Sequence, residues 1–365
     1  MIYFKKKKIK NFILNLYIFF NSFLVKINCL IFSNKSSNIK VFFGGSLTGN
    51  VGGTLVKIKR LKQKFNNNNF NFNCVYLLSN SVYLNKSAII NIKNKNIPII
   101  HNQNGVFYKG WYGDGWEEKN KEMSFQYKLA DYVLYQSNFS KYCAEKFLGK
   151  REGPGEILYN AVDQNIFYPT KKRELNSELR ILVTGKYQEH LYYSLEFILK
   201  ILYELNKKNI PAIINFAGYF DPKVLNKLLS FAKKHDIEDK VNFKGSYNQE
   251  NANLIYNSSD LYFYFVHQSN CPNSVIEAMS CGLPVVCSNT GGLPEIVNSY
   301  SGICLNTEKN WEKPMIPRAD EAIIAVNKII NNYSDYSLNS INKVTKDHNI
   351  KNWINKHEEI FKKFL

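Results

Sequence analysis

Residues 271–297 constrain the fold of this chain more than any other segment, because they indicate a helix, a strand and a second helix with a polar turn at each junction. Asn273 can cap a helix that begins at Ser274, and Gly282 is placed to end it. The apolar run 284–288 suits a strand that is buried on both faces. This alternation predicts an α/β fold with a parallel sheet.

The start of the first of these helices suits a diphosphate, since a helix start presents free backbone N–H groups and the positive end of the helix dipole. Asn273, Ser274 and Val275 lie at that start. Glu277 follows one turn later, and helical side chains lean toward the N-terminus, so its carboxylate points back at the opening. There it can accept two hydrogen bonds from a ribose. The alternative is that Glu277 only balances the dipole of a surface helix.

Residues 277–286 resemble the donor-binding signature of the GT-B glycosyltransferases, in particular of the retaining family 4 type. That signature contains two glutamates, and the second precedes Ala-Met-Ala-x-Gly-x-Pro-Val-Val, which the sequence from Glu277 matches closely. The resemblance assigns Glu277 to the ribose of the donor. The family's first glutamate contacts the transferred sugar, and Ser269 occupies its place here. The match therefore supports nucleotide binding more strongly than it supports a particular sugar.

A glycine-rich turn, residues 44–53, follows the first expected strand at 39–43. Such a turn lets the backbone approach a ligand closely, but it has neither the dinucleotide-binding spacing nor a Walker lysine. In family 4 enzymes the equivalent loop faces the cleft between the domains. The resemblance thus implies that Gly52 and Gly53 contact the donor.

A polar, aromatic loop is expected after a strand at 97–100, beginning at His101 and including the glycine- and tryptophan-rich stretch 110–116. Such a loop is typical of a ligand-facing position, and Trp or Tyr faces suit sugar rings. The alternative is that these aromatic residues bury the loop in the core. Family 4 enzymes place a histidine here near the donor sugar, and His101 and Asn104 are the two candidates for that catalytic role.

A second α/β series begins with a strand at 180–184. The family places an arginine at its end and a lysine five residues later, both on the donor diphosphate. Lys186 occupies the first position, whereas the second is Leu191, with His190 beside it. We expect Lys186 to stabilise the leaving diphosphate, which gains negative charge as the glycosidic bond breaks. His190 is the second candidate.

The resemblance extends over residues 39–365 and implies two Rossmann-like domains that face each other across a cleft. The expected boundaries are 39–172 for the N-terminal, acceptor-side domain and 173–349 for the C-terminal, donor-side domain. A terminal helix at 350–365 is expected to cross back onto the first domain. A length of 365 residues is sufficient for two domains with separate cores.

The net charge of +18 would favour an anionic partner, yet no nucleic-acid-binding motif accompanies it. Lys, Asn and Ile are enriched together, which indicates a compositional bias, so we expect no nucleic-acid partner. Seven scattered cysteines without a Cys-x-x-Cys pair favour a reducing cytoplasm. Six scattered histidines show no metal-ligand spacing, so we expect no structural zinc. The family resemblance implies that the reaction needs no metal, and we expect no other cofactor.

Residues 1–38 combine a basic block, 5–8, with an apolar stretch, 12–25. This stretch is shorter than the roughly 20 residues of a spanning helix, and no small-x-small cleavage site follows it. We expect residues 1–38 to contact the inner face of an anionic membrane. The alternative is a helix that packs on the N-terminal domain.

The sequence thus predicts a retaining glycosyltransferase that moves a sugar from a nucleoside diphosphate sugar to a saccharide or lipid-linked acceptor, in the synthesis of a cell-surface polysaccharide or glycolipid. A second hypothesis is a non-catalytic subunit of the same fold that binds a sugar nucleotide or a polysaccharide. Ser269 and the missing second basic residue favour this alternative.

Overall fold

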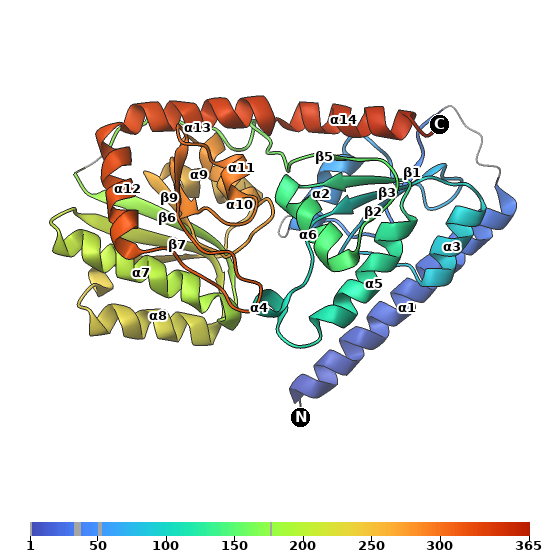
Figure 1. Ribbon diagram of the computed structural model, residues 1–365, viewed down its shortest axis with the longest axis horizontal. Coiled ribbons are helices and arrows are strands. Elements are labelled where there is room, and N and C mark those ends of the chain that lie inside the picture. Colours follow the sequence, from blue (N-terminus) through green and yellow to red (C-terminus); the bar gives the residue numbers. More distant parts are fainter. Residues whose placement is uncertain (1, 33–37, 50–52, 176) are drawn as a thin grey trace. The chain divides into compact units, whose positions relative to one another are not determined.

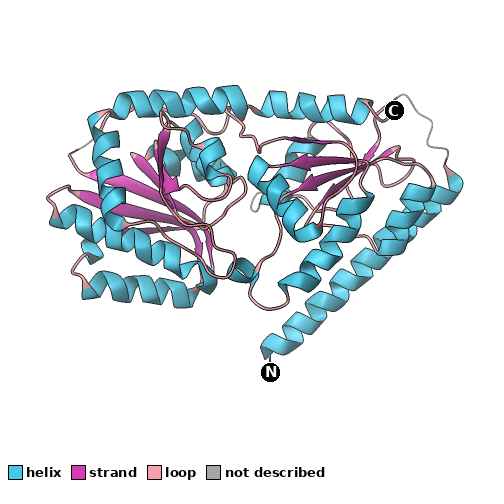
Figure 2. Ribbon diagram, viewed as in Figure 1, coloured by secondary structure: helices cyan, strands magenta, loops and turns pink. Residues whose placement is uncertain are grey.

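The computed structural model describes residues 2–32, 38–49, 53–175 and 177–365. Its elements form two compact units, each built around one parallel sheet (Figures 1 and 2). Unit 1 comprises Met1–Phe107, Gly115–Leu158 and Ile354–Leu365, and unit 2 comprises Tyr108–Asp114 and Tyr159–Trp353. The division falls after Leu158 rather than at 172, because residues such as Val162 and Phe167 are buried in the core of unit 2.

Unit 1 contains a five-stranded sheet in the order β1-β2-β3-β4-β5, with every neighbouring pair parallel. Its strands are β1 (Val41–Phe42), β2 (Cys74–Leu78), β3 (Ile99–Gln103), β4 (Tyr132–Tyr135) and β5 (Gly155–Ile157). Its helices are α1 (Ile2–Ile31), α2 (Gly53–Lys62), α3 (Lys86–Asn94), α5 (Trp116–Leu129), α6 (Asn138–Leu148) and the last turns of α14 (Ile350–Lys362).

The strand β3 continues further than its sequence indicates. The expected strand ended at 100, but β3 runs to Gln103, and all five of its residues are buried. Polar side chains such as His101 are accommodated because they bond within the unit: His101 Nε2 lies 2.8 Å from Gln103 Oε1. The expectation that His101 begins a ligand-facing loop is therefore wrong.

Helix α1 forms part of unit 1 and packs along α3 (Figure 1). Its second half holds the contacts: Ser22 Oγ accepts from the Asn85 N–H at 2.9 Å, and Val25 and Cys29 are buried. The helix is longer than the apolar stretch 12–25 suggested, because residues up to Ile31 continue it. Residues Asn11–Ile31, with a mean hydropathy of 1.5, are long and apolar enough to cross a membrane.

The last helix, α14, passes from unit 2 into unit 1, since its residues from Ile354 onward group with unit 1. Tyr76 OH in β2 lies 3.1 Å from His357 Nε2, and the Phe361 ring meets the edge of Phe65 at 5.0 Å. These buried contacts attach the C-terminal end of the chain to the first sheet.

Unit 2 contains a six-stranded parallel sheet in the order β11-β10-β9-β6-β7-β8. Its strands are β6 (Leu179–Tyr187), β7 (Ala212–Phe220), β8 (Val241–Gly245), β9 (Leu261–Tyr264), β10 (Val285–Ser288) and β11 (Gly302–Leu305). Its helical elements are α4 (Lys109–Tyr112), η1 (Glu189–Leu191), α7 (Tyr192–Lys207), α8 (Pro222–Lys234), η2 (Glu238–Lys240), α9 (Gln249–Asn257), α10 (Asn273–Ser280), α11 (Leu293–Ile296), α12 (Ala319–Asn331), α13 (Tyr333–Asp347) and the start of α14.

Alternation along β6 divides the core of unit 2 into two layers. Ile181 and Val183 lie in one apolar cluster with α7, α8 and α12, whereas Leu182 lies in the other with α10. Successive strand residues point to opposite faces, so a strand buried on both faces needs apolar residues throughout. Figure 2 shows the resulting layers of helices on both sides of this sheet.

Candidate functional site

The strand order of unit 2 reverses between β6 and β9, the first and fourth strands of its sheet. In open α/β sheets, ligands bind at the carboxyl ends of the strands where the order reverses, because the connections leave on opposite faces there and open a crevice. The residues that follow β6 and β9 therefore define the candidate site. Lys186 is the second-last residue of β6, and His190 and the start of α10 lie in the segments that follow these strands.

Helix α10 begins at Asn273, and its cap is Pro272, which has no side-chain hydrogen bond to offer. The expectation that Asn273 caps the helix is therefore wrong by one residue. Asn273 Oδ1 is buried and has no partner among the described residues. A helix start without a side-chain cap keeps its first N–H groups, from Asn273 to Val275, available to an anion.

The loop before α10 holds further buried polar atoms of this kind. His267 Nδ1, Gln268 Oε1 and Asn270 Oδ1 are also buried without a partner in the part of the chain that the structure describes. Buried polar atoms are nearly always hydrogen-bonded, so these three atoms in the loop and Asn273 Oδ1 at the helix start indicate a site for a polar ligand or ordered water. Gln268 also has a φ of 52°, which is uncommon for a residue other than glycine and is a form of strain often found at functional sites.

Glu277 is held by a chain of hydroxyl groups that joins three elements. Tyr256 OH, from α9, donates to Glu277 Oε2 at 3.0 Å and lies 3.2 Å from Thr184 Oγ1 in β6. Thr184 Oγ1 also lies 2.8 Å from Tyr262 OH in β9. Burial, with smaller contributions from Tyr247 and the Glu277 charge, raises the pKa of Tyr256 well above its usual range, so its hydroxyl stays protonated as a donor. Sequence motifs gave no signal for this support.

Ser269 lies against the glycine turn that follows β10. Its carbonyl accepts from the Gly292 N–H at 2.8 Å, and a Cβ at Gly291 would come 2.2 Å from the same oxygen. Gly291 also has a φ of 71°, so only glycine suits this position. The Ser269 hydroxyl lies 2.8 Å from Tyr264 OH at the end of β9. Ser269 therefore lies in the loop that leads into α10, beside the turn after β10.

Lys186 is exposed near the end of β6, and its Nζ lies 5.7 Å from the centre of the Tyr219 ring. It pairs with no carboxylate among the described residues. An ammonium group in this position is available to an anionic ligand. His190 follows in η1, where partial burial lowers the pKa of its imidazole, and the Trp111 ring lies 5.3 Å away.

The other predicted site residues belong to unit 1. His101 is fully buried, and burial lowers the pKa of its imidazole to about 4. Asn104 Oδ1 accepts from Lys57 Nζ at 3.0 Å, and its amide donates to Asn80 Oδ1 at 2.9 Å. Gly53 is the exposed first residue of α2, and Gly52 lies outside the described residues.

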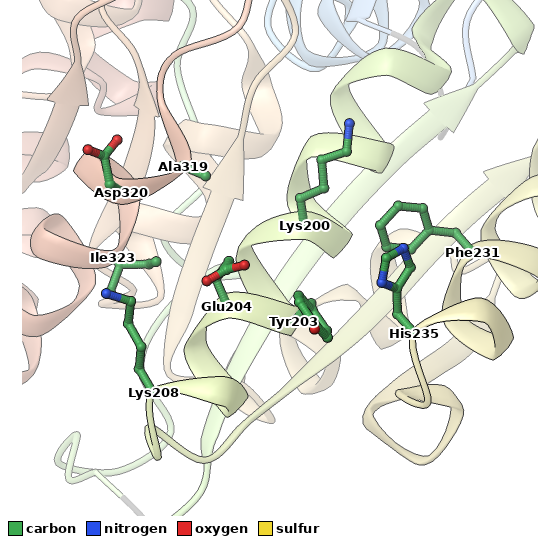
Figure 3. A pocket seen from close by; sticks show the side chains of 9 residues that line it. All are labelled: Lys200, Tyr203, Glu204, Lys208, Phe231, His235, Ala319, Asp320 and Ile323. Carbon is green, nitrogen blue, oxygen red and sulfur yellow. The ribbon is translucent and has the colours of Figure 1, made fainter.

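A hollow elsewhere in unit 2 does not coincide with these residues (Figure 3). It lies where α7 and α8 end and α12 begins, and its lining includes Tyr203, His235 and Asp320. Helix α7 starts at the carboxyl edge of the sheet and ends at the amino edge, so this hollow lies at the edge opposite to the site. The His235 ring stacks on Phe231 at 4.4 Å and closes one side of it.

A family model described as glycosyl transferases group 1 matches residues 171–332. The chain is similar to an uncharacterized glycosyltransferase of Haemophilus influenzae, with 29% identity over 173 residues, or 47% of each chain. It is also similar to the N-acetyl-alpha-D-glucosaminyl L-malate synthase of Bacillus anthracis, with 24% identity over 146 residues, 39% of this chain and 37% of the relative. These matches cover less than half of each relative.

Two solved structures share the fold. Sucrose-phosphate synthase from Thermosynechococcus elongatus gives a TM-score of 0.65 at 14% identity, over 84% of this chain and 76% of its own. Anabaena HepE, in a complex with UDP and glucose, gives a TM-score of 0.64 at 13% identity, over 80% and 77%. The chain therefore has the two-sheet α/β fold of these structures, the GT-B fold, and its residues 171–332 match the glycosyl transferases group 1 model.

Proposed function

We propose that this protein transfers a sugar from a nucleoside diphosphate sugar to an acceptor hydroxyl, with retention at the anomeric carbon. The proposal rests on the group of residues that lies at the carboxyl edge of the second sheet. Glu277, supported by Tyr256, and the uncapped start of α10 follow β9 there, and Lys186, which pairs with no carboxylate in the described part of the chain, lies at the end of β6. Glu277 is suited to bind a ribose, and the start of α10 is suited to bind a diphosphate. Lys186 is suited to stabilise the negative charge of the leaving group.

In this proposal the protein positions two substrates and stabilises the leaving diphosphate. Lys186 and the N–H groups of α10 meet the charge that develops as the glycosidic bond breaks, so their contribution is largest in the transition state. The donor phosphate oxygen accepts the proton of the acceptor hydroxyl. Because fixed positive groups neutralise the diphosphate, we propose that transfer requires no metal, and EDTA should leave the rate unchanged.

The first experiment is a thermal-shift panel of UDP, GDP and ADP with their sugars, since a ligand that binds only the folded state raises its melting temperature. The sugar nucleotide with the largest shift is then incubated with a panel of saccharide and lipid-linked acceptors. Transfer with an unchanged anomeric configuration, read by proton NMR, supports the proposal. The absence of any shift would contradict it.

The non-catalytic alternative rests on one specific observation. Ser269 replaces a sugar-binding glutamate, and its hydroxyl is already engaged with Tyr264 OH at 2.8 Å. A protein that only binds should show thermal shifts with nucleoside diphosphates but neither transfer nor hydrolysis over the whole panel. Turnover with any donor would exclude this alternative.

We further propose that α1 contacts an anionic membrane on the cytoplasmic side, where a lipid-linked or polysaccharide acceptor would be reached. The exposed part of α1 carries Phe12, Phe19 and Phe20, whose exposed fractions are 64%, 63% and 62%. Four consecutive lysines precede these residues in the sequence, at 5–8. Apolar and basic groups on one helix suit an interface that offers acyl chains and negative headgroups.

Flotation with vesicles tests this contact. The wild-type protein should float with phosphatidylglycerol vesicles, partly release at high salt, and float weakly with phosphatidylcholine vesicles, because salt screens only the lysine contribution. Replacing Phe12, Phe19 and Phe20 by serine should strongly reduce flotation and leave only a remainder that high salt removes. Equal flotation of the variant would contradict a role of α1.

A further inference from the structure

Unit 2 contains one segment that lies far from the rest of it in the sequence. Residues Tyr108–Asp114, which we call the strap, leave unit 1 after Phe107 and return to it at Gly115. The strap includes α4 and the sequence Lys-Gly-Trp-Tyr-Gly-Asp. The sequence of this stretch predicts a ligand-facing loop, and the alternative is that its aromatic residues are buried in the core. Trp111 and Tyr112 are 36% and 45% exposed, so the strap does not bury them in a core.

The strap is attached to the loop before α12 by close backbone contact. The Gly110 N–H donates to Trp311 O at 2.7 Å, and the Tyr108 ring meets the edge of Trp311 at 5.0 Å. A Cβ at Gly110 would come within 2.9 Å of Lys313 N and 3.0 Å of Trp311 O. Because those atoms belong to the backbone, any side chain at Gly110 would lift the strap from this loop.

The same loop connects the strap to the candidate site. Asn310 O accepts from Gln268 Nε2 at 3.1 Å and lies 3.0 Å from His267 Nε2. Gln268 Oε1 and His267 Nδ1, in the same two residues, are buried and have no hydrogen-bond partner among the residues that the structure describes. A series of contacts therefore connects the strap, through Trp311 and Asn310, to the loop that contains Ser269.

The strap also contacts η1, the helical turn that follows β6. The Trp111 ring lies 5.3 Å from the His190 ring, with the two planes at 86°. His190 follows β6 three residues after Tyr187, where the strand ends. An exposed indole fixed at the carboxyl edge of a sheet can stack on the apolar face of a pyranose, which buries C–H groups on a rigid aromatic surface.

We propose that Trp111 is a sugar-binding residue of this site, held in place by the strap, and that it contacts a pyranose ring of the donor or of the acceptor. This inference rests on the proposed function, because it requires a donor nucleotide bound at α10. It adds a specificity-determining residue from outside the matched segment 171–332. In this proposal, the close contact of Gly110 with Trp311 holds the Trp111 indole at a fixed position relative to the loop before α12.

The test compares Trp111→Ala, Trp111→Phe and Gly110→Ala with wild type. Calorimetry gives the affinities for UDP, UDP-glucose and UDP-N-acetylglucosamine, and a transfer assay gives the KM of methyl α-glucoside as an acceptor probe. Tyr300→Ala is the matched control, because Tyr300 is a 69% exposed aromatic residue between α11 and β11, at the amino edge of the same sheet.

If Trp111 contacts the donor sugar, Trp111→Ala weakens binding of the sugar nucleotide about tenfold or more and leaves UDP unchanged. If it contacts the acceptor, donor affinity is unchanged and the acceptor KM rises by a similar factor. Trp111→Phe should restore most of the loss, and Gly110→Ala should reproduce it. The assignment would be overturned if Trp111→Ala changed neither the affinity for the sugar nucleotide nor the acceptor KM. It would also be overturned if the variant lost affinity for UDP and for the sugar nucleotide by the same factor. If the wild type binds none of UDP, GDP, ADP and their sugars, the proposed function fails and this inference fails with it.

Discussion

Replacing Glu277 by alanine tests the assignment of the nucleotide site most directly. In the structure its carboxylate accepts from Tyr256 OH at 3.0 Å and is proposed to accept from the two ribose hydroxyl groups. A hydrogen bond to a charged acceptor contributes about 1.5–3 kcal/mol, and water can partly replace the lost contacts. We therefore expect the affinity for the nucleoside diphosphate to fall by about 1.5–3 kcal/mol, or about 10- to 150-fold.

The fold should survive this change. Tyr256 OH is buried, but it keeps Thr184 Oγ1 as a partner at 3.2 Å, so the substitution does not leave it unpaired. The cost in unfolding free energy should be about 1 kcal/mol, the value of one ordinary hydrogen bond. Thermal unfolding followed by circular dichroism checks that the protein is folded before its affinity is compared.

The assay is a cycle of two proteins and two ligands. Calorimetry measures the binding of UDP and of 2′-deoxy-UDP to the wild type and to Glu277→Ala. If the carboxylate binds the ribose, it should discriminate against the deoxy ligand in the wild type, and this discrimination should largely disappear in the variant. Glu321→Ala, which removes a carboxylate from the first turn of α12, is the control and should behave as wild type. Equal losses for both ligands would refute the ribose assignment.

Further outcomes follow from the same structure. Lys186→Ala should lower kcat more than it raises KM, because the charge it meets grows in the transition state; a change in KM alone would contradict this. Ser269→Glu should change the preference for the donor sugar while the affinity for the diphosphate stays nearly constant, and loss of diphosphate binding would show that this loop has another role. Removing residues 1–16 should leave the melting temperature unchanged, whereas removing 1–38 should lower it, because the second half of α1 is partly buried in unit 1; calorimetry of both truncations decides this. The folded pKa of His101, about 4, lies below its unfolded value, so the unfolded state binds more protons and stability falls as the pH drops from about 6.5 to 4; urea unfolding of His101→Asn should show a smaller fall.

The sequence alone determined the part of the site that depends on local signals. Glycine and proline end α10, an apolar run forms β10, and Gly291 turns the chain, as residues 271–297 predict. These features depend on interactions between residues close in the sequence, so periodicity and turn chemistry identify them. A short motif identifies Glu277, and an expected strand end in the resembling segment identifies Lys186.

Only the tertiary structure decided which distant residues support or complete the site. Tyr256 reaches Glu277 from another helix, and Trp111 lies beside His190 although 79 positions, the difference of their numbers, separate them. Likewise, His101 belongs to a fully buried strand, where its Nε2 lies 2.8 Å from Gln103 Oε1, although its polarity suggested a loop. Burial and hydrogen-bond partners are set by non-local packing, which can override the preference of a single residue, and no local pattern records them.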